Sequence, residues 1–470
     1  MGARRQRRQR HGGDAHRRPA RARAAPGRLR PPRRPAPGAC GLGGPPLPGP
    51  RAPPRADGVR AQGAARDRRP GDVRLVPRLA HGGAAGVSTR IPNAVPCLRG
   101  NEWTYLKECL DTNWVSSAGP FVDRFEREVA ERVGVPHAVA VVNGSAALHI
   151  ALLAAGVRAG DAVLVPSLTF IATVNAIAHC GAQPVFMDVE AVAWGMDPDK
   201  TADFLARECT LEAAGVVHRA TGRVVRAMLP VHLYGHPCDL DPLLAVARSY
   251  PLAVVEDAAE ALGARYRGRS VGGDGLAACL SFNGNKIVTA GGGGMVLTRD
   301  EALAARVRGL TTQARADAID YVHTEVAFNY RLTNLQAALG VAQLEQLDAF
   351  VSAKRETARH YTEALGRLDG VEPFTEAPWA FSTYWMYSVL LDPAAWGDRR
   401  ALIGRGQGAG IELRPLWYPT HRQPAFRDSP RYRVEVADRL HARGVSLPCS
   451  SGITAAERER VVAFLAGARR

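Results

Sequence analysis

The stretch Ser281-Phe-Asn-Gly-Asn-Lys286 places a lysine just after a short apolar run, and four glycines, Gly291 to Gly294, follow it. An earlier stretch, Val254-Val-Glu-Asp257, ends another apolar run on two acidic residues. Apolar runs of this length without polar alternation predict strands that are covered on both faces, as in a mostly parallel sheet. Residues that follow such strands meet at one edge of the sheet. We therefore expect Lys286 and Asp257 to lie at the same edge.

A lysine and an aspartate placed together in this way suit one cofactor. A lysine amine forms Schiff bases with carbonyl compounds, and a carboxylate beside a pyridinium nitrogen is the usual partner of lysine-bound pyridoxal phosphate, PLP. We hypothesise that Lys286 holds PLP as an imine and that Asp257 keeps its ring nitrogen protonated. Either residue alone has an ordinary explanation, as a solvated surface charge or as a turn residue. The ordered pair is the stronger signal.

Two stretches could bind the phosphate of such a cofactor. Asn143-Gly-Ser145-Ala146 lies between an expected strand and an expected helix, where free backbone N–H groups and the hydroxyl of Ser145 could receive a phosphate. An ordinary helix cap is the alternative. Ser281, at the end of the strand before the lysine loop, could add a second contact.

Four other side chains are candidates for contacts with the cofactor ring or the substrate. Phe170 could stack on a planar ring or belong to the core, and Glu260 could reach the 3-hydroxyl side of the cofactor or be a solvated helix residue. Arg331 and Arg414 could bind a carboxylate or phosphate through bidentate hydrogen bonds, although surface arginine is the ordinary explanation for both.

The charge of the chain is concentrated at its N-terminus. The formal net charge is +16, but residues 1–90 hold 22 arginines, no lysine and 4 aspartates, so that this segment carries +18 and the rest carries −2. The segment also has 14 of the 33 prolines and lacks Phe, Tyr, Trp and Ile. We expect it to be disordered, because it cannot bury enough apolar surface. Its alternatives are a translation artefact of GC-rich DNA, an inert tail, or an arm that binds nucleic acid or membrane; a transit peptide fits less well.

The remaining sequence predicts a cytoplasmic α/β protein. From Ile91 onward, expected strands and helices alternate, and we expect a large domain at residues 91–345 and a smaller one at 346–470. Eight scattered cysteines without a CxxC pair fit reduced thiols. No apolar run is long enough to span a bilayer. We predict no metal site, no membrane partner and no nucleic-acid partner.

Taken together, these motifs resemble the DegT/DnrJ/EryC1/StrS family of PLP-dependent sugar aminotransferases over about residues 92–465. Two of them look closest to a branch found in surface-polysaccharide and nonulosonic-acid gene clusters. The five motifs, in the family's order, are Asn143-Gly-Ser-Ala-Ala-Leu148, Pro166-Ser-Leu-Thr-Phe-Ile-Ala-Thr-Val-Asn-Ala-Ile177, Glu256-Asp-Ala-Ala-Glu-Ala-Leu-Gly263, Ser281-Phe-Asn-Gly-Asn-Lys286 and Asn329-Tyr-Arg-Leu-Thr-Asn-Leu-Gln-Ala-Ala338.

The resemblance implies PLP-dependent transferase fold type I, the aspartate-aminotransferase-like fold, and a homodimer with sites at its interface. It implies that Lys286 is the Schiff-base lysine and proton shuttle, that Asp257 pairs with the pyridine nitrogen and that Phe170 stacks on the ring.

For the phosphate, the resemblance implies contacts from Ser145, Ala146 and Ser281. It also implies that Asn329 reaches the phosphate of the neighbouring subunit's cofactor.

The chain departs from the family at two positions. Many members have Gln or His where this chain has Glu260, and many read Gly-Glu-Gly-Gly at Gly291 to Gly294. Relatives that carry histidine in place of the lysine catalyse dehydration, and Lys286 argues against that branch.

The expected reaction moves an amino group from glutamate to a nucleotide-linked 4-keto-6-deoxy sugar. Two alternatives remain open at this point. One is PLP-dependent dehydration, or amination of another ketone, on the same fold. The other is a non-catalytic binder of nucleotide sugar or nucleic acid that uses the basic tail.

Overall fold

The computed structural model describes residues 90–469, with the exception of residue 318. The tail predicted at residues 1–90 therefore lies outside the described residues, apart from Arg90. No helix in the described ranges is long and apolar enough to cross a membrane.

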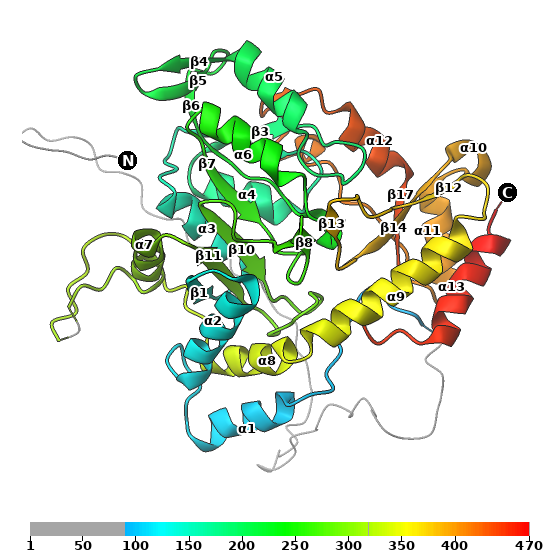
Figure 1. Ribbon diagram of the computed structural model, residues 1–470, viewed down its shortest axis with the longest axis horizontal. Helices are drawn as coiled ribbons and strands as arrows, with labels where there is room; N and C mark the ends of the chain where they lie inside the picture. The colour runs from blue at the N-terminus through cyan, green and yellow to red at the C-terminus, as the bar shows by residue number, and fades with distance from the viewer. Residues whose placement is uncertain (1–89, 318, 470) are drawn as a thin grey trace, which may run out of the picture. The chain divides into compact units, whose positions relative to one another are not determined.

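A ten-stranded sheet forms the centre of the large domain (Figure 1). Strands β10, β7, β6, β2, β3 and β16 are neighbours and run parallel, whereas β11 and β1 complete one end in antiparallel order. A hairpin of β4 and β5 extends from β6. The mostly parallel sheet predicted from the apolar runs is thus confirmed. The strands are β1 His137–Val141, β2 Ala162–Pro166, β3 Gln183–Met187, β4 Cys209–Glu212, β5 Gly215–His218, β6 Arg223–Met228, β7 Ala253–Asp257, β10 Ala277–Ser281, β11 Gly294–Thr298 and β16 Arg431–Tyr432.

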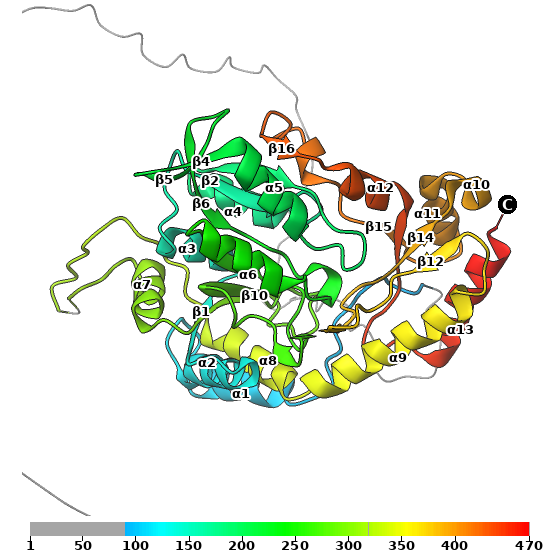
Figure 2. The same cartoon turned by 45° about the horizontal axis from the view of Figure 1, so that its top comes forward.

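Helices cover both faces of this sheet (Figure 2). Successive side chains of its strands enter two different apolar cores, because side chains alternate across a strand. Helices α2, α5, α6 and α8 supply the first core and α3, α4 and α7 supply the second. With α1, which packs on α8, these helices are α1 Glu102–Asp111, α2 Pro120–Val133, α3 Gly144–Ala154, α4 Ile171–His179, α5 Pro198–Glu208, α6 Leu240–Ser249, α7 Glu301–Thr311 and α8 Asn334–Leu344.

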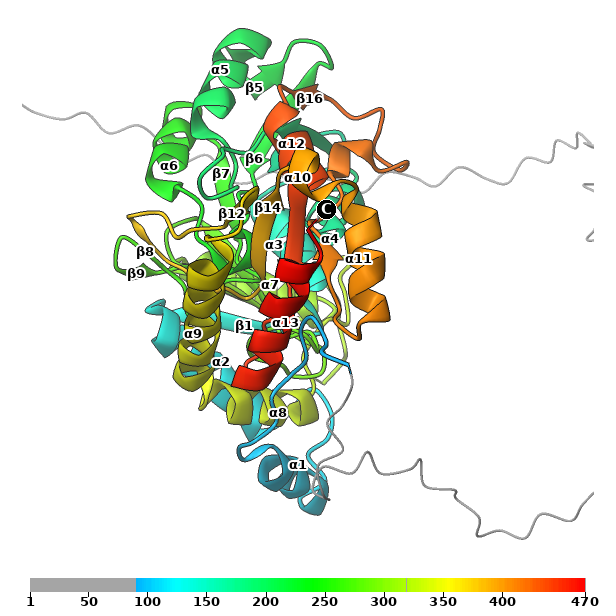
Figure 3. The ribbon, with the colours of Figure 1, turned by 90° about the vertical axis from the view of Figure 1, so that its right-hand side faces the viewer.

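The smaller domain is built on an antiparallel sheet in the order β12-β14-β17-β15. The long helix α9 connects it to the large domain, and α13 packs alongside α9 (Figure 3). Its elements are α9 Leu347–Leu365, β12 Val371–Pro373, β14 Tyr387–Leu391, α10 Pro393–Trp396, α11 Arg399–Gly408, β15 Arg414–Pro415, α12 Glu435–Arg443, β17 Gly444–Leu447 and α13 Ala455–Gly467. A third sheet joins β8 Arg265–Tyr266, β9 Arg269–Ser270 and β13 Ala380–Phe381, and short 3-10 turns lie at Leu233–Gly235 and Thr420–Arg422.

Two features differ from the simple division predicted at residue 345. The sequence predicts one helix over residues 334–350, but α8 ends and α9 begins around Glu345 and Gln346, whose side chains are held by α1 and its N-cap. In addition, β16 of the C-terminal part pairs with β3 of the large sheet, and Ile91 pairs with Ile411. The exact domain boundary stays a prediction.

Candidate active site

Lys286 lies in the turn that follows β10, with its amine directed into a cavity of about 300 Å³. Its Nζ is 3.7 Å from Oε1 of Glu260 and 3.9 Å from the ring centroid of Trp385. Burial lowers the pKa of Lys286, and the negative charges of Glu260 and Asp257 oppose this fall. A lysine in such surroundings is a candidate nucleophile and base.

Asp257 is the last residue of β7 and is 5% exposed. Its carboxylate accepts hydrogen bonds from Oγ1 of Thr173 at 2.7 Å and from the backbone N–H of Ala259 at 3.1 Å. Burial raises the pKa of Asp257, whereas these two bonds and the charge of Lys286 act in the opposite direction. The predicted meeting of Asp257 and Lys286 at one edge of the sheet is confirmed, since both line the same cavity.

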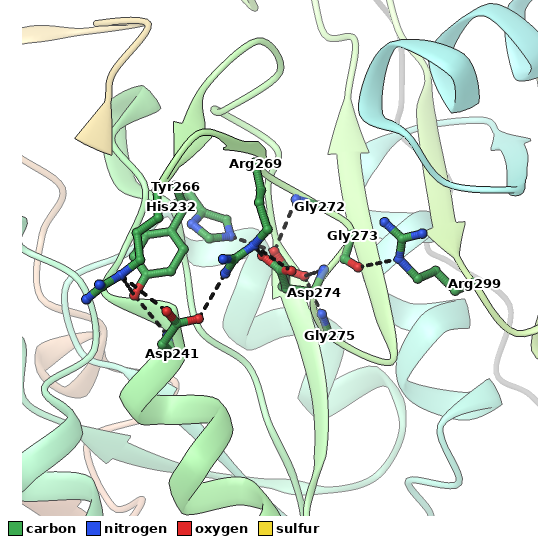
Figure 4. A network of polar contacts seen from close by, with 11 residues as sticks. His232, Asp241, Tyr266, Arg269, Gly272, Gly273, Asp274, Gly275 and Arg299 are labelled. Carbon is green, nitrogen blue, oxygen red and sulfur yellow. Dashed lines mark hydrogen bonds and ion pairs between the residues drawn. The ribbon is translucent and has the colours of Figure 1, made fainter. Parts of the chain in front are cut away.

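The neighbouring Glu256 points to the other face of β7 and stabilises this end of the strand. Its carboxylate lies 3.0 Å from Nε2 of His232 and accepts backbone hydrogen bonds from Gly272, Asp274 and Gly275. Figure 4 shows His232 close to Gly272, Asp274 and Gly275 in this network. The network therefore ties the end of β7, which carries Asp257, to the loop that precedes β10.

The N-terminus of α3 forms another wall of the cavity. Gly144 and Ser145 line it together with Ser281 at the end of β10. A Cβ on Gly144 would come within 2.7 Å of the Ser281 Cβ, so only glycine permits this close approach. Ala146, the third residue for which a phosphate contact is predicted, keeps that role only as a prediction. Its N–H donates to Oδ1 of Asn143 at 2.8 Å, and Ala146 does not line the cavity.

Aromatic side chains surround the mouth of the cavity. Phe170 is 48% exposed, which excludes the alternative of a core residue, and its ring centroid lies 5.0 Å from that of Trp417. The indole Nε1 of Trp385 donates to the carbonyl of Asn285 at 2.7 Å and thereby contacts the residue before Lys286.

Glu260 is also part of the cavity wall. It is 6% exposed, so the alternative of a solvated helix residue is wrong. Oε2 of Glu260 accepts the backbone N–H of Tyr234 at 2.7 Å, which leaves Oε1 facing Lys286. Burial raises the pKa of Glu260, and the charge of Lys286 opposes the rise.

This arrangement of lysine, aspartate and helix N-terminus agrees with a comparison against known families. The sequence model of the DegT/DnrJ/EryC1/StrS aminotransferase family matches residues 96–466. The chain belongs to this family.

Relatives of this aminotransferase include two GDP-perosamine synthases. That of Caulobacter vibrioides is 42% identical over 378 residues, which cover 80% of this chain and 97% of the relative. That of Escherichia coli O157:H7 is 41% identical over 359 residues, which cover 76% of this chain and 93% of the relative.

Solved structures of family members show the same fold. DesI, studied in the presence of its TDP-sugar product, is 31% identical with a TM-score of 0.71, and the match covers 82% of this chain and 94% of DesI. DesV of S. venezuelae, in complex with a ketimine intermediate, is 30% identical with a TM-score of 0.71, and the match covers 80% of this chain and 97% of DesV. The predicted fold type I is thereby confirmed.

Besides Ala146, three predicted site residues of this aminotransferase lie outside the lysine cavity. Arg331 is only 11% exposed, and its Nη1 donates to Glu126 at 2.9 Å and to the carbonyl of Ala140 at 3.0 Å. The Arg331 guanidinium is thus already held by Glu126 and the Ala140 carbonyl, and its predicted role in substrate binding has no support from these contacts. Asn329 is exposed between α7 and α8, and Arg414 pairs with Glu412 in a neighbouring cavity.

Several cavity residues were not predicted from the sequence. Thr173 lies one helical turn after Phe170, which is a local signal for a shared site. Trp385 and Trp417 come from the smaller domain, about a hundred residues or more beyond Lys286. Only tertiary packing brings them to the lysine.

Proposed function

We propose that this family member is a PLP-dependent aminotransferase that moves an amino group from glutamate to a nucleotide-linked 4-keto-6-deoxy sugar. We place this reaction in the cytoplasm and in the biosynthesis of a surface polysaccharide. The observation that carries the proposal is the cavity that contains the Lys286 amine and the buried Asp257 carboxylate. The names of the relatives, two of which are GDP-perosamine synthases, support the substrate class.

The residues of the cavity fit PLP. Asp257 is a buried acceptor that can hold a proton on the pyridine nitrogen, and Thr173 keeps it oriented. At the other end, the hydroxyls of Ser145 and Ser281 flank the N-terminus of α3, where a phosphate would be stabilised by free N–H groups and the helix dipole. Phe170 stands at the mouth of the cavity, where it can cover one face of the ring.

Bound PLP supplies an electron sink for the carbon atom that loses its proton. The chain supplies the proton transfers and the binding contacts. Because burial lowers the pKa of Lys286, a larger fraction of its amine is neutral near pH 7 and able to accept a proton from the α-carbon of the amino donor. Glu260 can hold the lysine near its working position and can also contact the 3-hydroxyl side of the cofactor.

We further propose that the enzyme works as a homodimer. Large apolar side chains are exposed on α1 and in the segment between α7 and α8, among them Trp103 at 77%, Ile319 at 86% and Val326 at 93%. Such exposure is unusual for a monomer and is typical of an interface. Asn329 belongs to the same segment, and in a dimer it could contact the phosphate at the partner's site.

The test of the reaction uses Lys286→Ala. This variant should lose glutamate-dependent amination of a nucleotide-linked keto sugar and the visible-edge absorbance of the purified enzyme. In the wild type, borohydride should fix the cofactor to the peptide that carries Lys286, as peptide mass spectrometry would show. Lys107→Ala is the matched control, because Lys107 is exposed on α1 and pairs there with Asp111. Retained turnover in Lys286→Ala, or labelling of another lysine, would refute the assignment.

A further inference from the structure

The turn Leu233–Gly235, between β6 and α6, carries a residue with a strained backbone. Tyr234 has φ 56° and ψ 20°, a left-handed conformation that bulky side chains rarely adopt. Tyr234 is 2% exposed, so its neighbours in the fold set this conformation. Strained residues persist only where the surrounding structure determines them, and they are concentrated at active sites.

The polar groups of Tyr234 bond to three separate segments of the chain. Its N–H donates to Oε2 of Glu260 at 2.7 Å. Its hydroxyl accepts the backbone N–H of Trp417 at 2.8 Å, and its carbonyl accepts that of Met386, the residue after Trp385, at 3.3 Å. Glu260, Trp385 and Trp417 all line the lysine cavity. One residue behind the cavity wall is thus connected to three parts of that wall.

The smaller domain packs directly on this turn. A Cβ on the next residue, Gly235, would come within 2.8 Å of the backbone nitrogen of Trp385, and the Gly235 carbonyl accepts the N–H of Thr383 at 3.0 Å. The Tyr234 ring lies between two tryptophans, with its centroid 6.5 Å from that of Trp385 and 5.7 Å from that of Trp417. These contacts hold the backbone of Tyr234 in its strained conformation.

The bond to Glu260 bears directly on Lys286. One carboxylate oxygen of Glu260 accepts the Tyr234 N–H, and the other lies 3.7 Å from Nζ of Lys286. Without the N–H, nothing on this side would keep the second oxygen directed toward the amine. The second carboxylate that acts on this amine, that of Asp257, has hydrogen bonds of its own. Tyr234 therefore orients one of the two negative charges beside Lys286.

We propose that Tyr234 is a positioning residue of the aminotransferase site. Its N–H holds the Glu260 carboxylate toward Lys286, and its hydroxyl fixes the backbone of Trp417 in the cavity wall. Tyr234 does not itself line the lysine cavity, so it acts through these two residues. The proposal rests on the proposed function and adds to it a residue that couples the two domains at the site.

Two substitutions test the backbone contact. Tyr234→Asn and Tyr234→Val both remove the ring and the hydroxyl, but asparagine tolerates the left-handed conformation and a β-branched residue does not. Tyr234→Val should therefore lose the N–H bond to Glu260. That loss raises the pKa of Glu260, and the weaker negative charge lowers the pKa of Lys286. In Tyr234→Asn the pKa of Lys286 should stay at the wild-type value.

Competitive acetylation of the cofactor-free protein over a range of pH, followed by peptide mass spectrometry, measures the pKa of Lys286. The measurement needs neither PLP nor substrate, so it tests the contact even if the proposed reaction is wrong. A pKa of Lys286 that is the same in Tyr234→Val as in Tyr234→Asn would overturn the role of the N–H.

Tyr234→Phe tests the hydroxyl alone, and it keeps the ring and the N–H bond. The pKa of Lys286 should not change, but the backbone N–H of Trp417 loses its acceptor. The half-reaction of the PLP-loaded enzyme with glutamate, followed by cofactor absorbance, should show an apparent dissociation constant that is about three- to tenfold higher. The rate at saturating glutamate should stay within about twofold of the wild type.

The matched control is Tyr361→Phe. The buried hydroxyl of Tyr361 donates to the carbonyl of Pro448 at 2.9 Å, and Tyr361 does not line the lysine cavity. This variant should change neither the glutamate affinity nor the pKa of Lys286. If Tyr234→Val does not fold, Tyr234→Phe decides the proposal. A loss of stability in Tyr234→Phe without a change in glutamate affinity would make the hydroxyl purely structural and would overturn the proposal.

Discussion

The hydrogen bond from Thr173 to Asp257 gives a sharp test of how the carboxylate is held. Thr173→Val replaces the hydroxyl by a methyl group of similar size on a helix that is fully buried at this point, since Thr173 is 1% exposed. Asp257 would then keep only the backbone N–H of Ala259 as a hydrogen-bond donor. The change therefore removes one of two donors from a buried carboxylate without opening a cavity.

The expected loss of stability depends on pH. A hydrogen bond to a charged group contributes about 1.5–3 kcal/mol, and a bond between neutral groups about 0.5–1.5 kcal/mol. Burial raises the pKa of Asp257 in the folded protein above its unfolded value, which is about 3.9. The favourable contribution of this group is therefore greatest below about pH 3.9 and declines as pH rises through the folded pKa. Because the lost bond favours the ionised form, Thr173→Val raises the folded pKa further.

We therefore expect Thr173→Val to reduce the free energy of unfolding by about 1.5–3 kcal/mol at pH 8, because the Asp257 carboxyl is ionised to a greater extent there than at pH 4. At pH 4 the reduction should be smaller by about 1–1.5 kcal/mol, since a larger fraction of the carboxyl is protonated there and needs this donor less. Urea unfolding of the cofactor-free protein, followed by tryptophan fluorescence at both pH values, measures the difference between variant and wild type.

The control is Thr169→Val. The hydroxyl of Thr169 forms a hydrogen bond with that of Thr173, at 2.9 Å. The substitution therefore removes a buried hydroxyl that does not contact Asp257. Its effect should be the same at both pH values. An equal loss at pH 4 and pH 8 in Thr173→Val, or a loss below about 0.5 kcal/mol at pH 8, would refute the reasoning.

Two other predictions concern the lysine and the assembly. Glu260→Gln removes a negative charge that raises the pKa of Lys286, so the pKa of Lys286 should fall. The acidic limb of the profile of kcat against pH should then move to lower pH. A limb that stays in place or moves to higher pH would contradict this prediction. Light scattering of the purified enzyme should give the mass of two chains. Val326→Asp should shift the measured mass toward that of one chain, because it places a charge on an exposed apolar side chain of the proposed interface. A wild-type mass of one chain would exclude the dimer.

Local patterns in the sequence predicted much of the fold. The apolar runs 138–142 and 162–165 predict strands, and they are β1 and β2 to within a residue or so. These elements depend on side chains that are near one another in the chain. By contrast, the break between α8 and α9 depends on contacts of Glu345 and Gln346 with residues around α1, which are more than two hundred positions away.

Lys286 and Asp257 were recognisable from the sequence because each follows a strand whose apolar composition is visible locally, and parallel packing then brings such strand ends together. The surroundings of Lys286 were not recognisable. Trp385 comes from the smaller domain and lies with its ring centroid 3.9 Å from Nζ, a contact that no local pattern around Lys286 predicts.

The sequence by itself thus determined the fold class and the lysine–aspartate pair, since both rest on strand periodicity and on residues at strand ends. Only the tertiary structure showed that two arginines predicted to bind substrate already pair with carboxylates. The motifs around Arg331 and Arg414 predict binding residues. In the folded chain, however, Glu126 and Glu412 form ion pairs with these two arginines and neutralise their charge. A charge is available only where no opposite charge reaches it, and that depends on the whole folded chain.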